Sequence, residues 1–453
     1  MGSGRQLTRP RTALFAGIAA VLTLGIAASG ALGAPPSKTI NVAIVDNPQM
    51  KDIAKLTPSL FTAKSNIKVR YTLLDEGKLR EVTTRDVAAG GRQFDVVMIG
   101  PYEAPQFGNS GFLTDLTPYA KADKSYRLGD LLPPVRKALS ANGKLYASPF
   151  YGESSFLMFR KDLLAKAGLT MPASPTWDQV ATIAKKLNTP TTAGICLRGK
   201  PGWGDLGASF TTVLNTFGGT WWSATPQGKV DKAQVNQPQF KQALQFYVDL
   251  VKSAGEKDAA NSSFNECLTQ YLDGKVAMWY DATVAAGLLE ATNSAVRGKN
   301  GYAFAPVSAT RRSGWLWTWA LAIPKTAKDP ATAWKYISFA TGPGYIKAAG
   351  GRIAGGWAAI PPGTRASTYQ IPQYKRAAAA FAGPTLASMR AAPIDNPGTS
   401  KRPGLPGVQY VGIPQFQDVG NKCTEQFSAV IAGRASIDSA ISNCQAIASR
   451  VKS

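Results

Sequence analysis

Residues 146–163 read YASPFYGESSFLMFRKDL, and this stretch decides the fold. Pro149 and Gly152 interrupt a β-prone run, so the pattern predicts one strand that arrives, a kink, and a second strand over residues 154–160 that leaves for a new domain. Glu153 lies at the kink. A carboxylate there is a solvated turn acid, the partner of a nearby arginine, or a group that binds a ligand.

Two later stretches also have the character of strands: AMWYDATVA (residues 277–285) and WLWTWALAIP (residues 315–324). We interpret all three stretches as passages between the same two bodies. A chain that crosses three times forms two lobes with a cleft and a hinge, and its ligand groups then belong at the crossings. The predicted N-terminal lobe comprises residues 38–148 and 282–322, and the C-terminal lobe residues 149–281 and 323–453.

The start of the chain predicts export. Arg5, Arg9 and Arg11 precede an apolar, small-residue run over residues 13–32, which is typical of a secretory signal peptide over residues 1–33. The alternative is an uncleaved membrane anchor, since the run is long enough to span a bilayer. We expect a soluble protein in the periplasm or cell envelope.

The chain is strongly basic, with a formal net charge of +23. A charge of this size raises nucleic acid as a partner. However, lysine and arginine are scattered, with no dense basic run or arginine-rich arm. We therefore interpret the charge as solubility and loose attraction to an anionic envelope, and we expect no nucleic-acid partner.

The four cysteines predict disulfides, because an even count in an oxidising compartment usually means pairing, here with three possible pairings. Cys423 is expected to pair with Cys444, because both lie in the helical C-terminal region, and Cys196 with Cys267 follows by elimination. Histidine is absent. Its absence excludes Ser-His-Asp and Cys-His nucleophile systems and argues against zinc, so we expect neither a metal nor a cofactor.

Residues 39–99 alternate buried strands with helices. Strands are predicted over residues 39–46, 66–74 and 94–99, with helices over residues 51–62 and 78–89 between them, which is the pattern of a parallel α/β sheet. Ligands of such sheets bind beyond the carboxyl ends of the strands, which here are residues 46–48 and 100–103.

Residues 202–207, GWGDLG, match the G-x-G-x-x-G pattern of dinucleotide-binding folds. In that fold the first glycine follows its strand tightly, whereas here Arg198, Lys200 and Pro201 intervene and no βαβ unit follows. We interpret the segment as a flexible turn that presents Trp203 and Asp205, with a helix N-terminus behind them.

Tryptophans gather at the predicted crossings. Trp315, Trp317 and Trp319 alternate with smaller residues, so a strand would place all three on one face. Packing in the core is the ordinary explanation and stays open for Trp315, whereas Trp317 and Trp319 are expected to border the cleft. Trp203, Trp279 and Trp357 add indoles beside turns or crossings. Aromatic faces stack on the C–H surface of a sugar or polyol, while planar polar side chains bind its hydroxyls.

Four carboxylates allow an enzymatic alternative. Two of them would serve as the acid and the nucleophile of a secreted glycosidase. Their separation cannot be read from sequence. The residues are Glu103, Glu153, Asp205 and Asp281. A purely structural envelope protein is a third class, but it leaves the aligned crossings unexplained.

Seven segments, in order, carry a family resemblance: FDVVMIGPYEAPQFG, PFYGESSFLMFRKDL, RGKPGWGD, AMWYDATVAA, WLWTWALAIP, GGWAAIPPGTR and GVQYVGIPQF. With these motifs the chain resembles family 1 of the extracellular solute-binding proteins of ATP-driven importers, specifically the sugar-binding branch with sorbitol- and mannitol-binding members. The resemblance covers nearly all of residues 38–450.

The resemblance implies a periplasmic-binding-protein fold of type II, cluster-D-like, in which two α/β lobes close around one ligand and dock on a membrane permease. It implies a monomeric binding protein for a sugar alcohol or monosaccharide, without catalysis, and a disaccharide is the alternative ligand. The ligand contacts that it implies are Asn47, Met50, Tyr102, Glu103, Glu153, Arg198, Trp203, Asp205, Trp279, Asp281, Trp319 and Trp357.

Overall fold

The computed structural model describes residues 1, 38–310, 314–395, 397 and 405–452. The predicted signal peptide, residues 1–33, lies outside these residues apart from Met1. Residues from Lys38 onward form one compact unit, and that unit is described below. Within the described part of the chain, no helix is both long enough and apolar enough to cross a bilayer.

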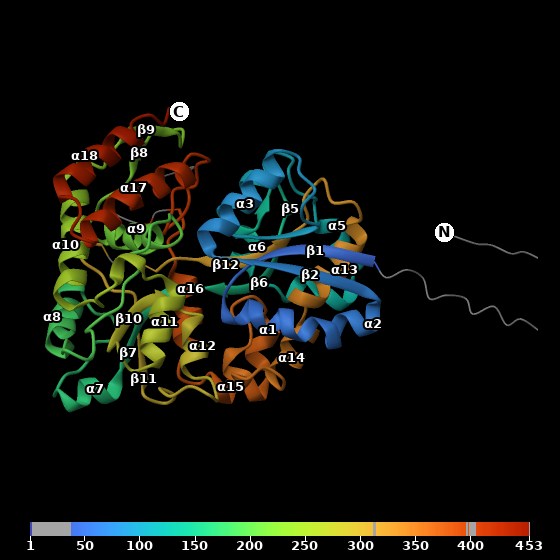
Figure 1. Ribbon diagram of the computed structural model, residues 1–453, viewed down its shortest axis with the longest axis horizontal. Helices are drawn as coiled ribbons and strands as arrows, with labels where there is room; N and C mark the ends of the chain where they lie inside the picture. The colour runs from blue at the N-terminus through green and yellow to red at the C-terminus, as the bar shows by residue number, and fades with distance from the viewer. Residues whose placement is uncertain (2–37, 311–313, 396, 398–404, 453) are drawn as a thin grey trace, which may run out of the picture. The chain divides into compact units, whose positions relative to one another are not determined.

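Two sheets organise this unit (Figure 1). A mixed five-stranded sheet has the order β2-β1-β3-β12-β6, and an antiparallel three-stranded sheet has the order β10-β7-β11. Shorter pairs are β4-β5 and β8-β9. The strands are β1 (Lys38–Val45), β2 (Ile67–Leu74), β3 (Val96–Ile99), β4 (Ser140–Ala141), β5 (Lys144–Leu145), β6 (Ser148–Glu153), β7 (Ser155–Arg160), β8 (Trp222–Ala224), β9 (Val230–Ala233), β10 (Met278–Ala282), β11 (Asn300–Phe304) and β12 (Trp317–Ala322).

Helices connect these strands. The α-helices are α1 (Pro48–Thr57), α2 (Ala63–Ser65), α3 (Glu76–Ala88), α4 (Glu103–Asn109), α5 (Thr117–Ala122), α6 (Pro133–Ala138), α7 (Lys161–Lys166), α8 (Trp177–Leu187), α9 (Leu206–Thr216), α10 (Pro238–Ala254), α11 (Phe264–Leu272), α12 (Ala285–Leu289), α13 (Pro330–Thr341), α14 (Pro343–Gly350), α15 (Pro372–Ala377), α16 (Ala382–Ala391), α17 (Phe416–Ile431) and α18 (Ile437–Ala448). Short 3₁₀ or π turns are η1 (Pro58–Thr62), η2 (Lys124–Tyr126), η3 (Leu128–Asp130), η4 (Ala259–Asn261), η5 (Gly356–Ala359) and η6 (Ala366–Gln370).

The five-stranded sheet begins with the predicted parallel unit. β1 pairs in parallel with β2 and with β3, and helices α1 and α3 make the connections. All four residues of β3 are buried, as expected for a central strand with both faces covered. β12 runs antiparallel between β3 and β6. The parallel α/β prediction for residues 39–99 is therefore confirmed.

The first predicted crossing is confirmed. β6 ends at Glu153 in the five-stranded sheet, and β7 begins at Ser155 in the three-stranded sheet. At the kink, the Gly152 N–H donates to the Pro362 carbonyl over 2.9 Å. A Cβ at Gly152 would lie 2.4 Å from the Gly363 carbonyl oxygen, so the close approach of the two backbones requires glycine.

The prediction that residues 277–285 cross between the lobes is wrong. β10, which these residues contain, pairs with β7, and β11 also pairs with β7, so the chain stays in the three-stranded sheet through Phe304. It returns to the five-stranded sheet with β12. A further passage follows α14, because α13 and α14 pack on β6 and α1, whereas α16 packs on β7 and β11.

Strand pairing also places three elements on the other side of the predicted lobe boundaries. β6 was assigned to the C-terminal lobe but is an edge strand of the five-stranded sheet, and β11 was assigned to the N-terminal lobe but lies in the three-stranded sheet. α13, from residues 323–453, packs on β6. The fold is thus mixed α/β with three passages, but the second predicted passage is replaced by one within residues 351–381.

Both disulfides join the predicted partners. Cys423 of α17 bonds to Cys444 of α18, with 5.0 Å between their Cα atoms. Cys196 bonds to Cys267 of α11, with a Cα separation of 5.7 Å. The first bond links a helix pair that also packs on α10 (Figure 1), and the second joins a loop to a helix next to the pocket described below.

Replacing Cys423 and Cys444 together by alanine is expected to lower the free energy of unfolding by roughly 3 kcal/mol, because the bond restricts a loop of this length in the unfolded chain. The cysteines are 21 residues apart. Urea unfolding without reductant measures the difference from wild type. The difference should largely vanish when both proteins are unfolded in dithiothreitol, and an unchanged unfolding curve in the oxidised state would contradict the prediction.

Candidate functional site

A pocket of about 790 Å³, including its part open to solvent, is lined by residues from both sheets and their connections. Asp46 and Asn47 follow β1, and Asp75 and Glu76 follow β2. This position is the predicted one, beyond the carboxyl ends of parallel strands. Residues that follow Cys196 and the first turn of α11 close the pocket from the side of the three-stranded sheet.

Seven of the predicted ligand contacts line this pocket. They come from the five-stranded sheet, from the turn after β1 and from the loop that leads to α9. They are Asn47, Glu153, Arg198, Trp203, Asp205, Trp317 and Trp319. Trp315, whose role the sequence left open, lines the pocket as well. All three alternating indoles of this segment thus share the pocket, as the period of a strand predicts.

Five predicted contacts lie outside the described lining, and most of them support it from behind. Glu103 and Asp281 hold arginines of the pocket, and the Tyr102 ring lies 4.7 Å from the Trp203 ring. Trp279 is completely buried, packs on Phe264, and donates its indole N–H to Asp281 over 3.1 Å. Direct contact of these four side chains with a ligand stays a prediction.

Trp357 lies farther from the pocket. It belongs to η5, which packs on α12, α14 and α15. A Cβ at Gly350 would come within 2.4 Å of the Trp357 indole, so this ring is seated against α14. Met50, which the resemblance also implied, is fully buried, and its backbone N–H donates to the Asn47 side chain that caps α1.

Arg80 of α3 is the centre of one ion-pair cluster. Its guanidinium binds Glu103 Oε1 and Glu76 Oε1, each over 2.6 Å. The position follows from the helix, because residues 76 and 80 are one turn apart on α3 and therefore share a face. Although burial favours the neutral form, Glu103 and Glu76 raise the pKa of Arg80.

Three indoles surround the same guanidinium. The Arg80 Cζ lies 4.1 Å from the Trp203 ring centre, 4.7 Å from that of Trp317 and 4.9 Å from that of Trp319. Cation–π attraction therefore adds to the ion pairs and fixes the orientation of the rings. The pocket wall is a rigid aromatic surface rather than a set of mobile side chains.

Arg198 is the centre of a second cluster. Its Nε and Nη2 form a bidentate pair with Asp281 over 2.8 and 2.6 Å, and its Nη1 donates to the Gly204 carbonyl over 2.9 Å. Burial opposes the charged form, but Asp281 raises the pKa of Arg198 above its ordinary value. The same Nη1 lies 3.6 Å from Glu76 Oε2, so Glu76 stands between the two arginine clusters.

The GWGDLG turn fits between these clusters because it lacks side chains where they would collide. A Cβ at Gly204 would lie 2.3 Å from Glu76 Oε1 and 2.9 Å from Arg80 Nη2. Gly202 has φ +141°, which L side chains rarely adopt. The turn presents Trp203 and Asp205 to the pocket at the start of α9, as predicted.

Two buried carboxylates of the pocket have no ion-pair partner among the described residues. The Glu153 side chain is 5% exposed, and its Oε2 accepts no hydrogen bond. Burial raises its pKa well above the ordinary value; Arg198 opposes this effect, whereas Asp281 and Glu76 add to it. Asp205 accepts a hydrogen bond from the Ser263 hydroxyl, and burial raises its pKa to about 6.

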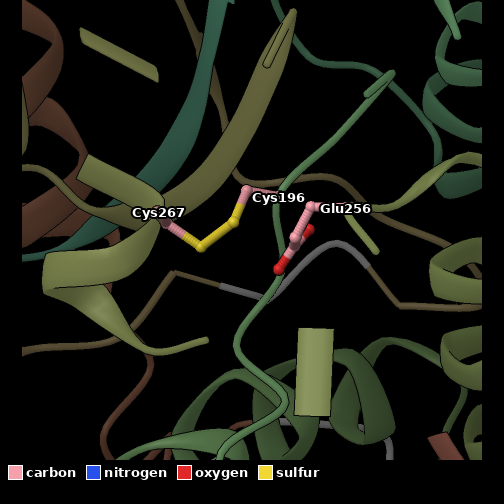
Figure 2. A group of neighbouring side chains, drawn as sticks. All are labelled: Cys196, Glu256 and Cys267. Atoms are coloured by element: carbon pink, nitrogen blue, oxygen red, sulfur yellow. A yellow bond between two sulfur atoms is a disulfide. The ribbon is translucent and has the colours of Figure 1, made fainter. Parts of the chain in front are cut away.

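One further group has metal-ligand residue types. Figure 2 shows Glu256 beside the Cys196–Cys267 disulfide, and one ligand atom from each residue lies within 4.8 Å of the others. The two sulfurs bond to each other, so neither offers the thiolate that a soft metal prefers. Burial raises the pKa of the Glu256 carboxyl to about 7.

Sequence reasoning missed several residues of the pocket. Glu76 and Arg80 could have been found from the rule that ligands bind at the ends of parallel strands, because they follow β2 and are spaced one helical turn apart. Tyr151 and Lys200 lie within segments that the sequence singled out, whereas the α11 turn from Ser263 to Glu266 and Gln409 carried no such local sign.

The family model described as bacterial extracellular solute-binding protein matches residues 43–347. A mannitol-binding protein of Pseudomonas aeruginosa is 39% identical over 431 residues, which cover 94% of this chain and 94% of that protein.

Solved structures are also similar. An ABC transporter solute-binding protein from Agrobacterium vitis with bound D-mannitol has a TM-score of 0.86 and 43% identity, covering 91% of this chain and 98% of its own. A solute-binding protein from Agrobacterium radiobacter in complex with ribitol has a TM-score of 0.78 and covers 92% of this chain and 100% of its own. Since the latter is 23% identical, it supports the two-lobed fold alone.

Proposed function

The chain belongs to the bacterial extracellular solute-binding proteins, and from this premise we propose that it binds a sugar alcohol such as mannitol for an ABC importer. The proposal rests on the relatives whose names carry mannitol and on the chemistry of the pocket. The ligand is delivered to a membrane permease, which is the partner of such proteins.

The observation that carries the proposal is a set of buried pocket atoms that lack hydrogen-bond partners. Its donors are Arg80 Nε, Trp203 Nε1 and Trp315 Nε1, and its acceptors are Glu153 Oε2 and Gln409 Oε1. Buried polar atoms are rarely left unpaired in native proteins. A hydroxyl both donates and accepts, so a molecule rich in hydroxyls can satisfy the two kinds of atom together. The indole walls suit its C–H surface.

In the proposed mechanism, ligand binding is coupled to closure of the two lobes. Two contacts join residues of different lobes and can form only when the lobes meet. Glu76 lies 3.6 Å from Arg198, and Asn265 Nδ2 donates to the Asp46 carbonyl over 2.9 Å. A ligand that bridges the same residues favours the closed form. Closure excludes water and creates the surface that the permease recognises.

We propose that the protein performs no catalysis. The proposal rests on the family match and on the mannitol-binding relative, which are binding proteins. Of the four carboxylates that a glycosidase could use, Glu103 and Asp281 are bound to arginines, so the glycosidase alternative depends on Glu153 and Asp205. The proposed location is the periplasm or cell envelope, after removal of residues 1–33.

Titration calorimetry against mannitol, sorbitol, ribitol, glucose and maltose tests the function. The wild-type protein should bind one mannitol per protein molecule. The mannitol that is recovered after binding should be chemically unchanged. Selective binding of maltose would favour the disaccharide alternative, and release of reducing sugar from a glycoside would favour the enzyme. Absence of binding to every polyol would contradict the proposal.

Replacing Glu153 by alanine should weaken mannitol binding by well over about tenfold, or more than ~1.4 kcal/mol, because the ligand loses a buried acceptor. The fold should stay intact, since Glu153 holds no ion pair among the described residues. Glu256→Ala is the matched control: it removes another buried carboxylate, but one outside the pocket, and should leave the affinity unchanged. Wild-type affinity of Glu153→Ala would remove this residue from the site.

A further inference from the structure

The ion pairs of the pocket leave an excess of negative charge. Arg80 is bound by Glu76 and Glu103, and Arg198 is bound by Asp281 and faces Glu76. Two cations are thus shared among three carboxylates before any other group is counted. Among the described lining residues, Asp46, Asp75, Glu76, Glu153, Asp205 and Glu266 are acidic, whereas only Arg80, Arg198 and Lys200 are basic.

Glu153 is the group that this arrangement leaves without compensation. It is 5% exposed, it lines the pocket, and its Oε2 has no hydrogen-bond partner within the part of the chain that the structure describes. The cation that acts on it most strongly is Arg198, which is already held by Asp281 through two hydrogen bonds and by the Gly204 carbonyl. A buried carboxylate without a partner is costly unless it is protonated or meets a cation.

The Gln409 side chain provides a second acceptor in the pocket. Gln409 donates its amide N–H to the Leu316 carbonyl over 3.2 Å, which fixes the orientation of the amide. Its Oε1 is then directed elsewhere, lies buried, and has no hydrogen-bond partner among the residues that the structure describes. Gln409 and Glu153 therefore offer two unsatisfied acceptors in one pocket, which indoles also line.

We propose that the pocket also binds polyhydroxylated amines, such as amino-alditols, with the ammonium group placed at Glu153. This inference rests on the proposed polyol function and extends it to a charged class of ligand. An ammonium supplies three hydrogen-bond donors and no acceptor, which matches unpaired acceptors better than a hydroxyl does. Glu153 is already buried in the free protein, so binding removes little further water from this side chain, and the ligand loses its own hydration.

The burial of Glu153 supports the same ligand class. Desolvation raises its pKa well above the ordinary value, so burial favours the protonated form of this carboxyl group. A protonated carboxyl group keeps only part of its capacity to accept hydrogen bonds. An ammonium nearby favours the ionised form, in which both oxygens accept.

The test compares D-mannitol with 1-amino-1-deoxy-D-mannitol by titration calorimetry at pH 7, because the two ligands differ only in one terminal group. The amine is expected to bind at least about tenfold more tightly to the wild-type protein. In E153Q this preference should fall to about twofold or less, while mannitol still binds, since glutamine keeps an acceptor for hydroxyls. E256Q is the matched control and should keep the preference in full.

The outcomes separate the two proposals. If mannitol binds and the amine binds no more tightly, or if the preference survives in E153Q, this inference is overturned and the polyol function stands. If neither ligand binds the wild-type protein, the proposed function fails and this inference fails with it. Should E153Q not fold, the ratio of the two wild-type affinities still decides.

Discussion

Arg198→Met is expected to lower the free energy of unfolding by about 3 to 5 kcal/mol and to abolish measurable polyol binding. Methionine replaces the apolar stem of arginine, but Asp281, which is completely buried, loses both bonds to the guanidinium. An uncompensated charge then remains in the interior. The Gly204 carbonyl also loses its donor, which removes one of the hydrogen bonds that hold the turn with Trp203.

Urea unfolding and calorimetry measure the two effects. The control is Arg85→Met, which removes an arginine from an exposed ion pair with Glu81 and should leave the unfolding curve nearly unchanged. The double variant R198M/D281N should recover part of the stability, because it removes both charges together. If Arg198→Met unfolds like the wild type, Asp281 does not depend on this arginine.

Trp279→Ala is expected to cost about 3 to 5 kcal/mol of stability, because it empties a fully packed position. The indole has no exposed surface, lies against the rings of Phe264 and Tyr271, and donates to Asp281. Binding should weaken as a consequence, because Asp281 orients Arg198 in the pocket. This expectation differs from the sequence prediction, which treated Trp279 as a direct ligand contact.

Two variants separate these roles in unfolding and binding measurements. Trp279→Phe keeps most of the ring volume and loses only the N–H, so it should cost much less stability than alanine. Trp357→Ala, which changes a partly buried indole outside the pocket, should leave polyol affinity unchanged. If Trp279→Ala keeps wild-type stability but loses binding, the indole contacts the ligand after all.

The parts of the fold that sequence predicts well are those with local causes. Alternating strands and helices over residues 39–99, the break beside Glu153, and the shared face of Trp317 and Trp319 each depend on neighbours in sequence, and the structure confirms them. The disulfides were predictable because few cysteines leave few pairings.

The wrong second crossing shows where local reasoning fails. Residues 277–285 contain β10, a strand that is buried on both faces, and such a strand has the same apolar sequence whether it stays in a sheet or passes to another. The strand with which it pairs decides which sheet it joins. That strand is β7, more than a hundred residues earlier in the chain.

The site was predicted in part for the same reason. Residues at the ends of predicted strands, such as Asn47 and Glu153, reach the pocket directly. Arg80 and Gln409 reach it through packing of segments that are distant in sequence. Conversely, Glu103 and Asp281 have the residue type of ligand contacts but bind arginines instead, and nothing in a single sequence separates a carboxylate that binds a ligand from one that binds an arginine.

The bond between Cys196 and Cys267 makes any preparation depend on the host that produces it. Cys196 lies two residues before Arg198, and Cys267 anchors the helix whose first turn covers the pocket. Protein that folds in a reducing cytosol lacks this disulfide, so its apparent affinity for the polyol should vary from batch to batch. Counting free thiols by mass spectrometry before each assay is therefore the first quality control for quantitative work on this molecule.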